Sequence, residues 1–253
     1  MPKAKTTKSS TLPTDSDLNR LTKTILAAAN PEKAKLLQRF FKTAPGQYGH
    51  GDIFHGITVP HQRLIAKQFL HLEFPQIQKL LNSKFHEERL IALLILVQNF
   101  ETATKQKNSI QQQSITDFYL KNSTKINNWD LVDLSAGKIL GSFLLTRPRK
   151  ILYKLVKSKN LWERRIAIIA TSTFIRNKDF SDTLQISELL LNDRHDLMHK
   201  AVGWMLREVG KVDRPTLDKF LHTHYHEMPR TALRYAIEHY PEAQRQKFLK
   251  GLI

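Results

Sequence analysis

The sequence has 253 residues, of which 41% are hydrophobic and 25% are charged, so it is long enough to fold around a substantial buried core. Its formal net charge of +17 opposes compaction and indicates an anionic partner, such as a nucleic acid or an anionic membrane. Because the chain contains no cysteine, disulfide bonds, thiolate metal sites and cysteine nucleophiles are excluded.

The first 16 residues are basic and polar, and they contain almost nothing to bury. We expect residues 1–16 to form a disordered basic arm. The arm lacks the apolar segment of a secretory signal, and no apolar run in the chain reaches the roughly 18 residues of a membrane span. We therefore expect a single domain over residues 17–253 and no membrane partner.

From residue 17 onwards the composition predicts helices almost throughout. Leu, Ala, Lys, Gln and Arg dominate, and the alternating β-branched pattern of strands is scarce. Leu18, Leu21 and Ile25 recur at helical spacing, and Pro31 is typical of a second helix start. The exception is the segment 43–60, which holds four glycines and two prolines. An irregular segment of this length favours a functional role.

Beyond this loop, four segments follow one pattern, in which a basic residue precedes a small residue by two or three positions. The segments are 86–96, 161–170, 196–206 and 228–237, and their basic residues are Arg89, Arg165, Lys200 and Arg230. The last three basic residues are 35 and 30 positions apart, which is the length of a two-helix unit. We therefore expect an all-α fold, an α-solenoid in which small residues allow close packing and basic side chains reach one concave face.

The segment 127–133, Asn-Asn-Trp-Asp-Leu-Val-Asp, combines a helix start with two carboxylates. Its first asparagine suits an N-cap, and Asp130 takes the position of a capping-box acid, so we expect Asp130 to cap the helix. Asp133 lies four residues after Trp129, so the two share a helix face. An acid at the edge of the apolar stripe needs either a water-filled cleft or an ion-pair partner. The candidate partners in the next repeat are Arg164 and Arg165.

The segment 147–165 carries eight basic residues against one acid, Glu163. The eight are Arg147, Arg149, Lys150, Lys154, Lys157, Lys159, Arg164 and Arg165. A solvated surface normally mixes charges of both signs, so this one-sided segment favours contact with DNA phosphates. The alternative is an ordinary solvated helix and loop.

The remaining aromatic and histidine residues give weaker signals. Trp162 and Trp204 fit core packing, and spacing alone does not favour a site. His222, His224 and His226 alternate near the end of a predicted helix, where this spacing points the rings apart. The sequence has no phosphate-binding loop, zinc-protease motif or catalytic-triad order, so we expect neither a cofactor nor a metal.

Several of these segments resemble the AlkD family of DNA alkylation repair enzymes. The segments are 40–49 with Gly51 and Asp52, 57–60 with Arg63, 127–133, 162–165 and 200–208, and the likeness runs from about residue 18 to the C-terminus. The resemblance implies an α-solenoid of HEAT-like repeats that holds duplex DNA against its concave basic face. It also implies a monomeric, cytoplasmic and nucleoid-associated glycosylase. Such an enzyme removes N3- and N7-alkylated purines, such as 3-methyladenine and 7-methylguanine, without a cofactor and without base flipping.

The resemblance further implies roles for individual residues. Trp129 corresponds to an aromatic that packs on the sugar of the lesion, and Asp133 to the catalytic carboxylate. Arg165 corresponds to an arginine that supports the site and its phosphates, and Trp204 to the second aromatic of the cleft. The candidates for an early aromatic of the cleft are Phe40, Phe41 and Tyr48. We also assign Tyr48 and Lys200 to DNA binding, together with the basic segment above.

An alkylated purine carries a positive charge, so it leaves without a proton from the enzyme. A carboxylate near C1′ then stabilises the oxocarbenium-like sugar, and aromatic faces add about 1–2 kcal/mol. Two other functions compete with this hypothesis. A non-catalytic DNA-binding module would keep the basic surface and lose base release, whereas a protein-interaction scaffold would carry mixed charges on its concave face.

Overall fold

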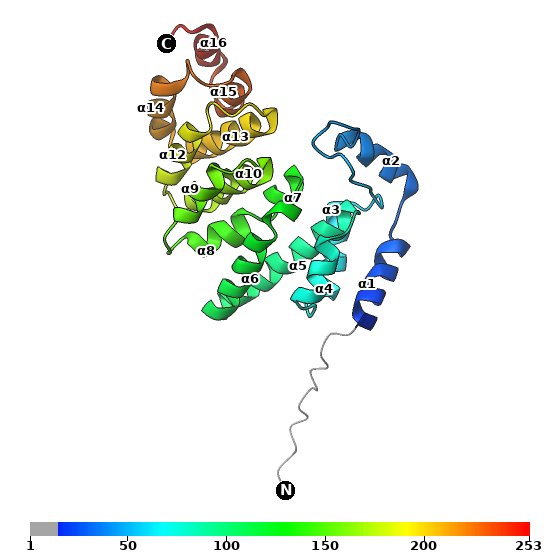
Figure 1. Ribbon diagram of the computed structural model, residues 1–253. Helices are drawn as coiled ribbons and strands as arrows, with labels where there is room; N and C mark the ends of the chain where they lie inside the picture. Colours follow the sequence, from blue (N-terminus) through cyan, green and yellow to red (C-terminus); the bar gives the residue numbers. More distant parts are fainter. Residues whose placement is uncertain (1–14) are drawn as a thin grey trace. The chain divides into compact units, whose positions relative to one another are not determined.

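A computed structural model describes residues 15–253 (Figure 1). The predicted arm lies outside this range, except that residues 15 and 16 belong to the first helix. Within residues 15–253 every regular element is a helix, and the β-contact is an isolated parallel bridge between Ile53 and Phe85. The predicted all-α fold is confirmed.

The described helices form two compact units, residues 15–95 (unit 1) and 96–253 (unit 2), and the division falls inside helix α5. The described elements of unit 1 are α1 (Asp15–Ala27), α2 (Pro31–Phe40), α3 (Val59–Gln68), α4 (Phe74–Leu81) and the first half of α5 (His86–Lys105). The division into two units falls inside one continuous helix and does not test whether residues 17–253 form a single domain. The single domain stays a prediction.

Unit 2 continues from the second half of α5 with a succession of short and long helices (Figure 1). They are α6 (Ser109–Lys121), the 3₁₀-helix η1 (Ser123–Lys125), α7 (Trp129–Asp133), the π-helix η2 (Gly137–Gly141), α8 (Ser142–Leu144), α9 (Lys150–Val156), α10 (Leu161–Ala170), α11 (Ser172–Arg176), α12 (Ser181–Leu189), α13 (Asp196–Val212), α14 (Arg214–His224), α15 (Arg230–Ala236) and α16 (Glu242–Lys250). Helix α10 packs against α7, α9 and α13, and α13 packs against α12, α14 and α15. Successive helical pairs therefore stack on one another, as in an α-solenoid.

Glycines allow the closest of these approaches. A Cβ at Gly203 would lie 2.4 Å from the carbonyl oxygen of Ala232, so the backbones of α13 and α15 nearly touch. A Cβ at Gly141 would lie 2.2 Å from the carbonyl oxygen of Ala170, which brings η2 equally close to α10. Close packing at small residues was expected from the repeat pattern, and Gly203, in the segment 196–206, agrees with it.

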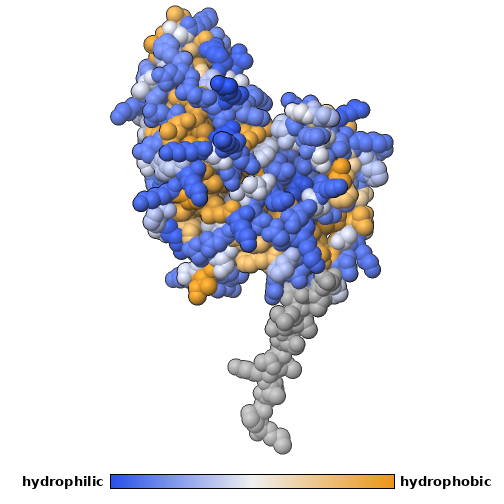
Figure 2. All heavy atoms as spheres, viewed as in Figure 1, coloured by the Kyte–Doolittle hydropathy of each residue, from blue (hydrophilic) through white to orange (hydrophobic). Residues whose placement is uncertain are grey.

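The core consists of the apolar faces that the sequence pattern indicated. Every residue of the apolar run 90–97 is at most 3% exposed, and Leu131, Val132, Ile139 and Leu140 are fully buried. In the view of Figure 2, hydrophilic residues cover most of the surface and hydrophobic residues show between them. None of the helices in residues 15–253 combines the length and the apolar composition that crossing a bilayer requires.

The glycine-rich loop of unit 1 is ordered by a buried carboxylate. Glu87, which has no exposed surface, accepts hydrogen bonds from the backbone N–H groups of His55, Gly56 and Ile57 at 3.0, 2.8 and 3.2 Å. Gly56 has a φ of +85°, and a Cβ there would lie 2.0 Å from the carbonyl oxygen of Asn30. Only glycine fits this backbone conformation next to α2.

Candidate active site

Asp133 and Arg165 form a two-point ion pair between α7 and α10. Arg165 donates from Nε to Oδ1 of Asp133 at 2.9 Å and from Nη2 to Oδ2 at 2.8 Å. The planar fork of a guanidinium matches the two carboxylate oxygens, a geometry that lysine does not reproduce. The ion pair that the sequence left open therefore exists, and its arginine is Arg165. It holds the carboxylate in one orientation.

Arg165 also connects this pair to α13. Its Nη1 donates to the carbonyl oxygen of Leu197 at 2.6 Å, and only 5% of its side chain is exposed. Leu197 is the second residue of α13, so the guanidinium links α7 and α13 through α10. Arg165 thus holds Asp133, while its role in a site and its contact with phosphates stay predictions.

The carboxylate of Asp133 is not sealed inside the core. Its side chain keeps 13% of its surface exposed, whereas its partner keeps 5%. Trp129 begins the same short helix one turn earlier and is also partly exposed, so the indole and the carboxylate share one face of α7. Asp130 differs, because it is buried and its Oδ1 accepts from the backbone N–H of Leu131. Asp130 therefore makes a local bond at the helix start, while Asp133 reaches the next repeat.

Burial raises the pKa of Asp133 above that of an ordinary aspartate. The charge of Arg165 and its hydrogen bonds oppose this increase, and the nearby charge of Asp130 adds to it. Desolvation disfavours the charged form of a carboxyl group, whereas a neighbouring guanidinium favours it. Asp133 is therefore a carboxylate whose ionised form depends on Arg165.

Tyr119 and Ser135 are connected to α7 by hydrogen bonds, and neither was predicted from the sequence. Tyr119 is fully buried, and its hydroxyl lies 3.0 Å from Oγ of Ser135, which in turn donates to the carbonyl oxygen of Leu131 at 2.5 Å. Burial raises the pKa of Tyr119, and the negative charge of Asp133 raises it further. Both residues fit an ordinary helix pattern, so no sequence signal distinguished them.

Trp204 lies on α13, on the helix face that also carries Leu197. The two residues are seven positions apart, so they are two turns, or about 10 Å, from one another along the same side of the helix. The indole is partly exposed, and its Nε1 donates to Oε1 of Glu208 at 3.1 Å. Lys200 lies between them on this face and pairs with Asp196 at 2.7 Å. The structure thus links Asp133 and Arg165 directly, and Trp204 lies along the helix that Arg165 contacts.

In the basic segment 147–165, the arginines contact carboxylates, a carbonyl or an aromatic ring of the same chain. The lysines form no ion pair within residues 15–253. Arg149 pairs with Asp179 and Asp182, each at 2.6 Å, and Arg164 pairs with Asp193 at 2.6 Å. Arg147 lies over the ring of Phe143, 4.2 Å from its centroid, and donates to the Phe143 carbonyl oxygen at 2.9 Å. The exposed lysines of this segment, which have no ion pair within residues 15–253, are Lys150, Lys154, Lys157 and Lys159.

The three early aromatics of unit 1 differ in exposure. Phe41 is 6% exposed and stacks on Phe54, with ring centroids 5.1 Å apart. Phe40 is 63% exposed, and Tyr48 is partly exposed. Phe41 therefore belongs to the core of unit 1, and Phe40 presents the most accessible ring of the three.

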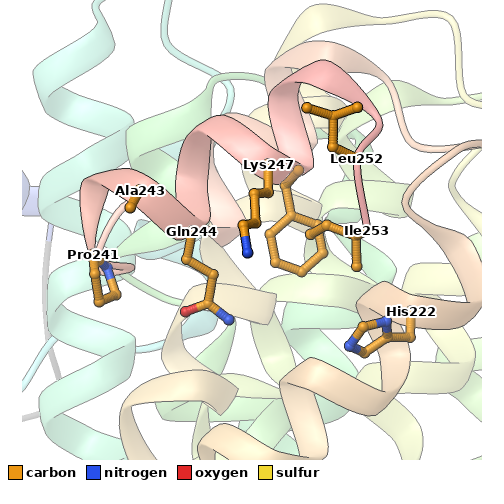
Figure 3. Close-up of a pocket in the computed structure, with 8 residues that line it drawn as sticks. His222, Pro241, Ala243, Gln244, Lys247, Leu252 and Ile253 are labelled. Atoms are coloured by element: carbon orange, nitrogen blue, oxygen red, sulfur yellow. The ribbon is translucent and has the colours of Figure 1, made fainter.

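A separate pocket of about 510 Å³ lies beside α16 and contains none of the predicted site residues. Phe248, Lys247 and His222 are among its lining residues (Figure 3). His222, His224 and His226 do not gather around a common point, and residues 15–253 contain no cluster of three or more His, Asp or Glu side chains that could hold a metal ion. The candidates Trp129, Asp133, Arg165 and Trp204 lie elsewhere in unit 2, on α7, α10 and α13.

Comparisons with known proteins agree with this fold. A family described as DNA alkylation repair enzyme has a model that matches residues 21–240 of the chain. The chain is similar to a solved structure described as a predicted DNA alkylation repair enzyme from Enterococcus faecalis, with a TM-score of 0.67 and 19% identity. The likeness covers 85% of this chain and 97% of that one, and at this identity it shows the fold alone. No curated protein matches the chain.

Proposed function

The chain belongs to the family of DNA alkylation repair enzymes, and from this premise we propose that it is a DNA glycosylase. Its substrate would be duplex DNA that contains N3- or N7-alkylated purines. The enzyme would hydrolyse the bond between the deoxyribose and the cationic base. The observation that carries this proposal is the partly exposed carboxylate of Asp133, which Arg165 holds in a fixed orientation by two hydrogen bonds.

The proposed chemistry needs little more than charge stabilisation. The bond between C1′ and the purine nitrogen breaks, and its electron pair neutralises the cationic base, which leaves. The sugar becomes an oxocarbenium-like cation, which the ionised Asp133 stabilises until water adds to C1′ and releases a proton to the solvent. The indoles of Trp129 and Trp204 offer negative ring faces to the same cation, worth about 1–2 kcal/mol. No general acid is required.

The four exposed lysines of the basic segment are the groups best suited to bind DNA phosphates. The neighbouring arginines already pair with aspartates or lie on aromatic rings, so they have less charge to offer. Each phosphate contact releases counterions, which makes binding weaker as salt increases. We infer that Lys150, Lys154, Lys157 and Lys159 contribute most of this salt dependence within the segment.

A quadruple lysine-to-glutamine variant at these four positions tests this inference. The slope of log K against log salt for duplex DNA should become less steep by about 3 to 4, because each lost contact removes about 0.9 from the slope. Fluorescence anisotropy over a salt series measures the slope. A matched control replaces four other exposed lysines of unit 2, Lys105, Lys107, Lys121 and Lys178. Equal slopes for the two variants would contradict the inference.

The raised pKa of Asp133 predicts how activity depends on pH. A carboxyl group with a raised pKa takes up a proton at a higher pH than an ordinary aspartate, so the ionised form disappears earlier on acidification. Enzymatic base release should therefore decline on the acid side with a midpoint above 3.8, the usual aspartate value. Single-turnover release at a series of pH values, corrected for spontaneous depurination, measures it. A midpoint at or below 3.8 would exclude Asp133 as the titrating group.

A direct assay tests the proposed function. The protein is incubated with methylated duplex DNA, and the free bases are separated and identified by chromatography. Release of 7-methylguanine and 3-methyladenine is expected. The alternative is a non-catalytic DNA-binding module, which would bind the same duplex and release no base. A protein that neither binds nor cleaves methylated DNA would refute both.

A further inference from the structure

Glu208 contacts the indole of Trp204 and has no role in the chemistry described so far. The Nε1–H of Trp204 donates to Oε1 of Glu208 at 3.1 Å, and the two residues are four positions apart on α13. We propose that Glu208 is a positioning residue, which fixes the ring of Trp204 and makes its face more negative. This inference rests on the proposed glycosylase function, because it concerns the indole that would face the sugar cation.

The backbone of Trp204 is already fixed by packing. The preceding residue is Gly203, where a Cβ would lie 2.4 Å from the Ala232 carbonyl oxygen and 2.6 Å from Cβ of Tyr235. At this point α13 therefore lies so close to α15 that it cannot approach further without a clash. What remains free is the rotation of the indole about its two side-chain torsions. A hydrogen bond at Nε1, at the edge of the ring, removes that freedom.

The carboxylate of Glu208 is itself bonded by Lys211 and lies near Arg207, whose Nη1 pairs with Glu238. Nζ of Lys211 lies 2.8 Å from its Oε1, and Nε of Arg207 lies 3.6 Å from the same oxygen. Its side chain is 29% exposed, so it is partly shielded from solvent. The bond from Lys211 restrains this carboxylate, so it presents a less mobile acceptor to the indole than a glutamate without a partner would.

An ionised acceptor also changes the electron density of the indole ring. The Nε1–H bond to a carboxylate is charge-assisted, and it shifts electron density from the N–H group into the indole. The face of the ring attracts cations because of its negative quadrupole, and added electron density strengthens this attraction. Glu208 therefore acts on the sugar cation through Trp204 in two ways, by orientation and by polarisation.

Three variants separate these contributions. Glu208→Ala removes the acceptor and the charge, and the single-turnover rate of 7-methylguanine release should decrease about tenfold. Glu208→Gln keeps an acceptor oxygen and loses the charge, so a decrease of about threefold is expected. Glu242→Ala is the matched control, because Glu242 bonds to Arg245 and Gln246 of its own helix α16, and the rate should stay unchanged. Binding of methylated duplex should change less than the rate in both Glu208 variants, because the indole acts on the transition state.

The indole N–H resonance of Trp204 gives a readout that does not depend on activity. It is identified in the ¹⁵N–¹H spectrum by its loss in Trp204→Phe. It should move upfield in Glu208→Ala, move less in Glu208→Gln and stay in place in Glu242→Ala. A wild-type chain that releases no base would refute the glycosylase function and this role with it. An active wild-type chain whose Glu208→Ala variant reacts at the same rate, or keeps its Trp204 resonance, would refute the role of Glu208 alone.

Discussion

Replacing Asp133 by asparagine should abolish the release of 7-methylguanine while binding of methylated duplex DNA survives. The amide keeps the shape of the side chain and loses the negative charge that would stabilise the sugar cation. Removing one electrostatic contact to a developing charge typically costs about 10²–10³ in rate. Single-turnover assays with saturating protein measure the rate, and anisotropy measures binding.

A neighbouring carboxylate provides the control for this substitution. Asp130→Asn lies on the same short helix and keeps Oδ1, which accepts from the backbone of Leu131. It should release bases at close to the wild-type rate. Since asparagine at position 133 leaves Arg165 without its anion, the melting temperature is recorded for both variants, and rates are compared only on folded protein. Wild-type excision by folded Asp133→Asn protein would remove the carboxylate from the mechanism.

Arg165→Ala should have the second large effect, on stability as well as on rate. The variant leaves a largely buried carboxylate without its cation and leaves the carbonyl of Leu197 without its donor. Breaking a buried pair on one side costs about 3–5 kcal/mol of unfolding free energy. The pKa of Asp133 should rise further, since the guanidinium that opposes the increase is gone. The protonated acid would no longer stabilise a cation, so base release should also fall.

Urea unfolding and base release on the same preparations measure both effects. Arg165→Lys keeps the charge but not the two-point geometry, and it should recover part of the stability and little of the rate. Arg214→Ala is the control for stability, because Arg214 pairs with Asp218 and lies over the Tyr240 ring, and neither partner is a proposed site residue. It should lower stability without slowing release by the folded fraction. If Arg165→Ala bound duplex DNA as wild type does at every salt concentration, its predicted phosphate contact would be wrong.

Helix positions and the core were predictable because they follow from local spacing, whereas the partners of charged residues were not. Arg164 and Arg165 are adjacent in sequence but point about 100° apart on α10. One therefore reaches Asp193 and the other reaches Asp133. Periodicity placed both arginines near the correct repeat, and it could not decide between them because the rotation of the helix is set by tertiary packing.

Tertiary packing also limited what could be predicted from the net charge of a segment. The segment 147–165 has eight basic residues and one acid, so the sequence indicated a uniformly positive surface. In the structure, aspartates 29 to 33 positions further along the chain neutralise Arg149 and Arg164. A count within a segment does not include these distant acids. The four lysines are exposed and can contact phosphates, as the sequence indicated. Arg149 and Arg164 are already paired with aspartates.

The hydrogen bond from Arg165 to the carbonyl of Leu197 limits how far this helical-repeat architecture is modular. Repeat proteins usually tolerate the gain or loss of whole units, because each unit contacts only its neighbours. Here the orientation of an acid on α7 depends on a backbone oxygen in the first turn of α13. Units could be appended beyond this stretch, but a chain shortened or lengthened between residues 133 and 197 would lose the alignment even with every functional side chain present.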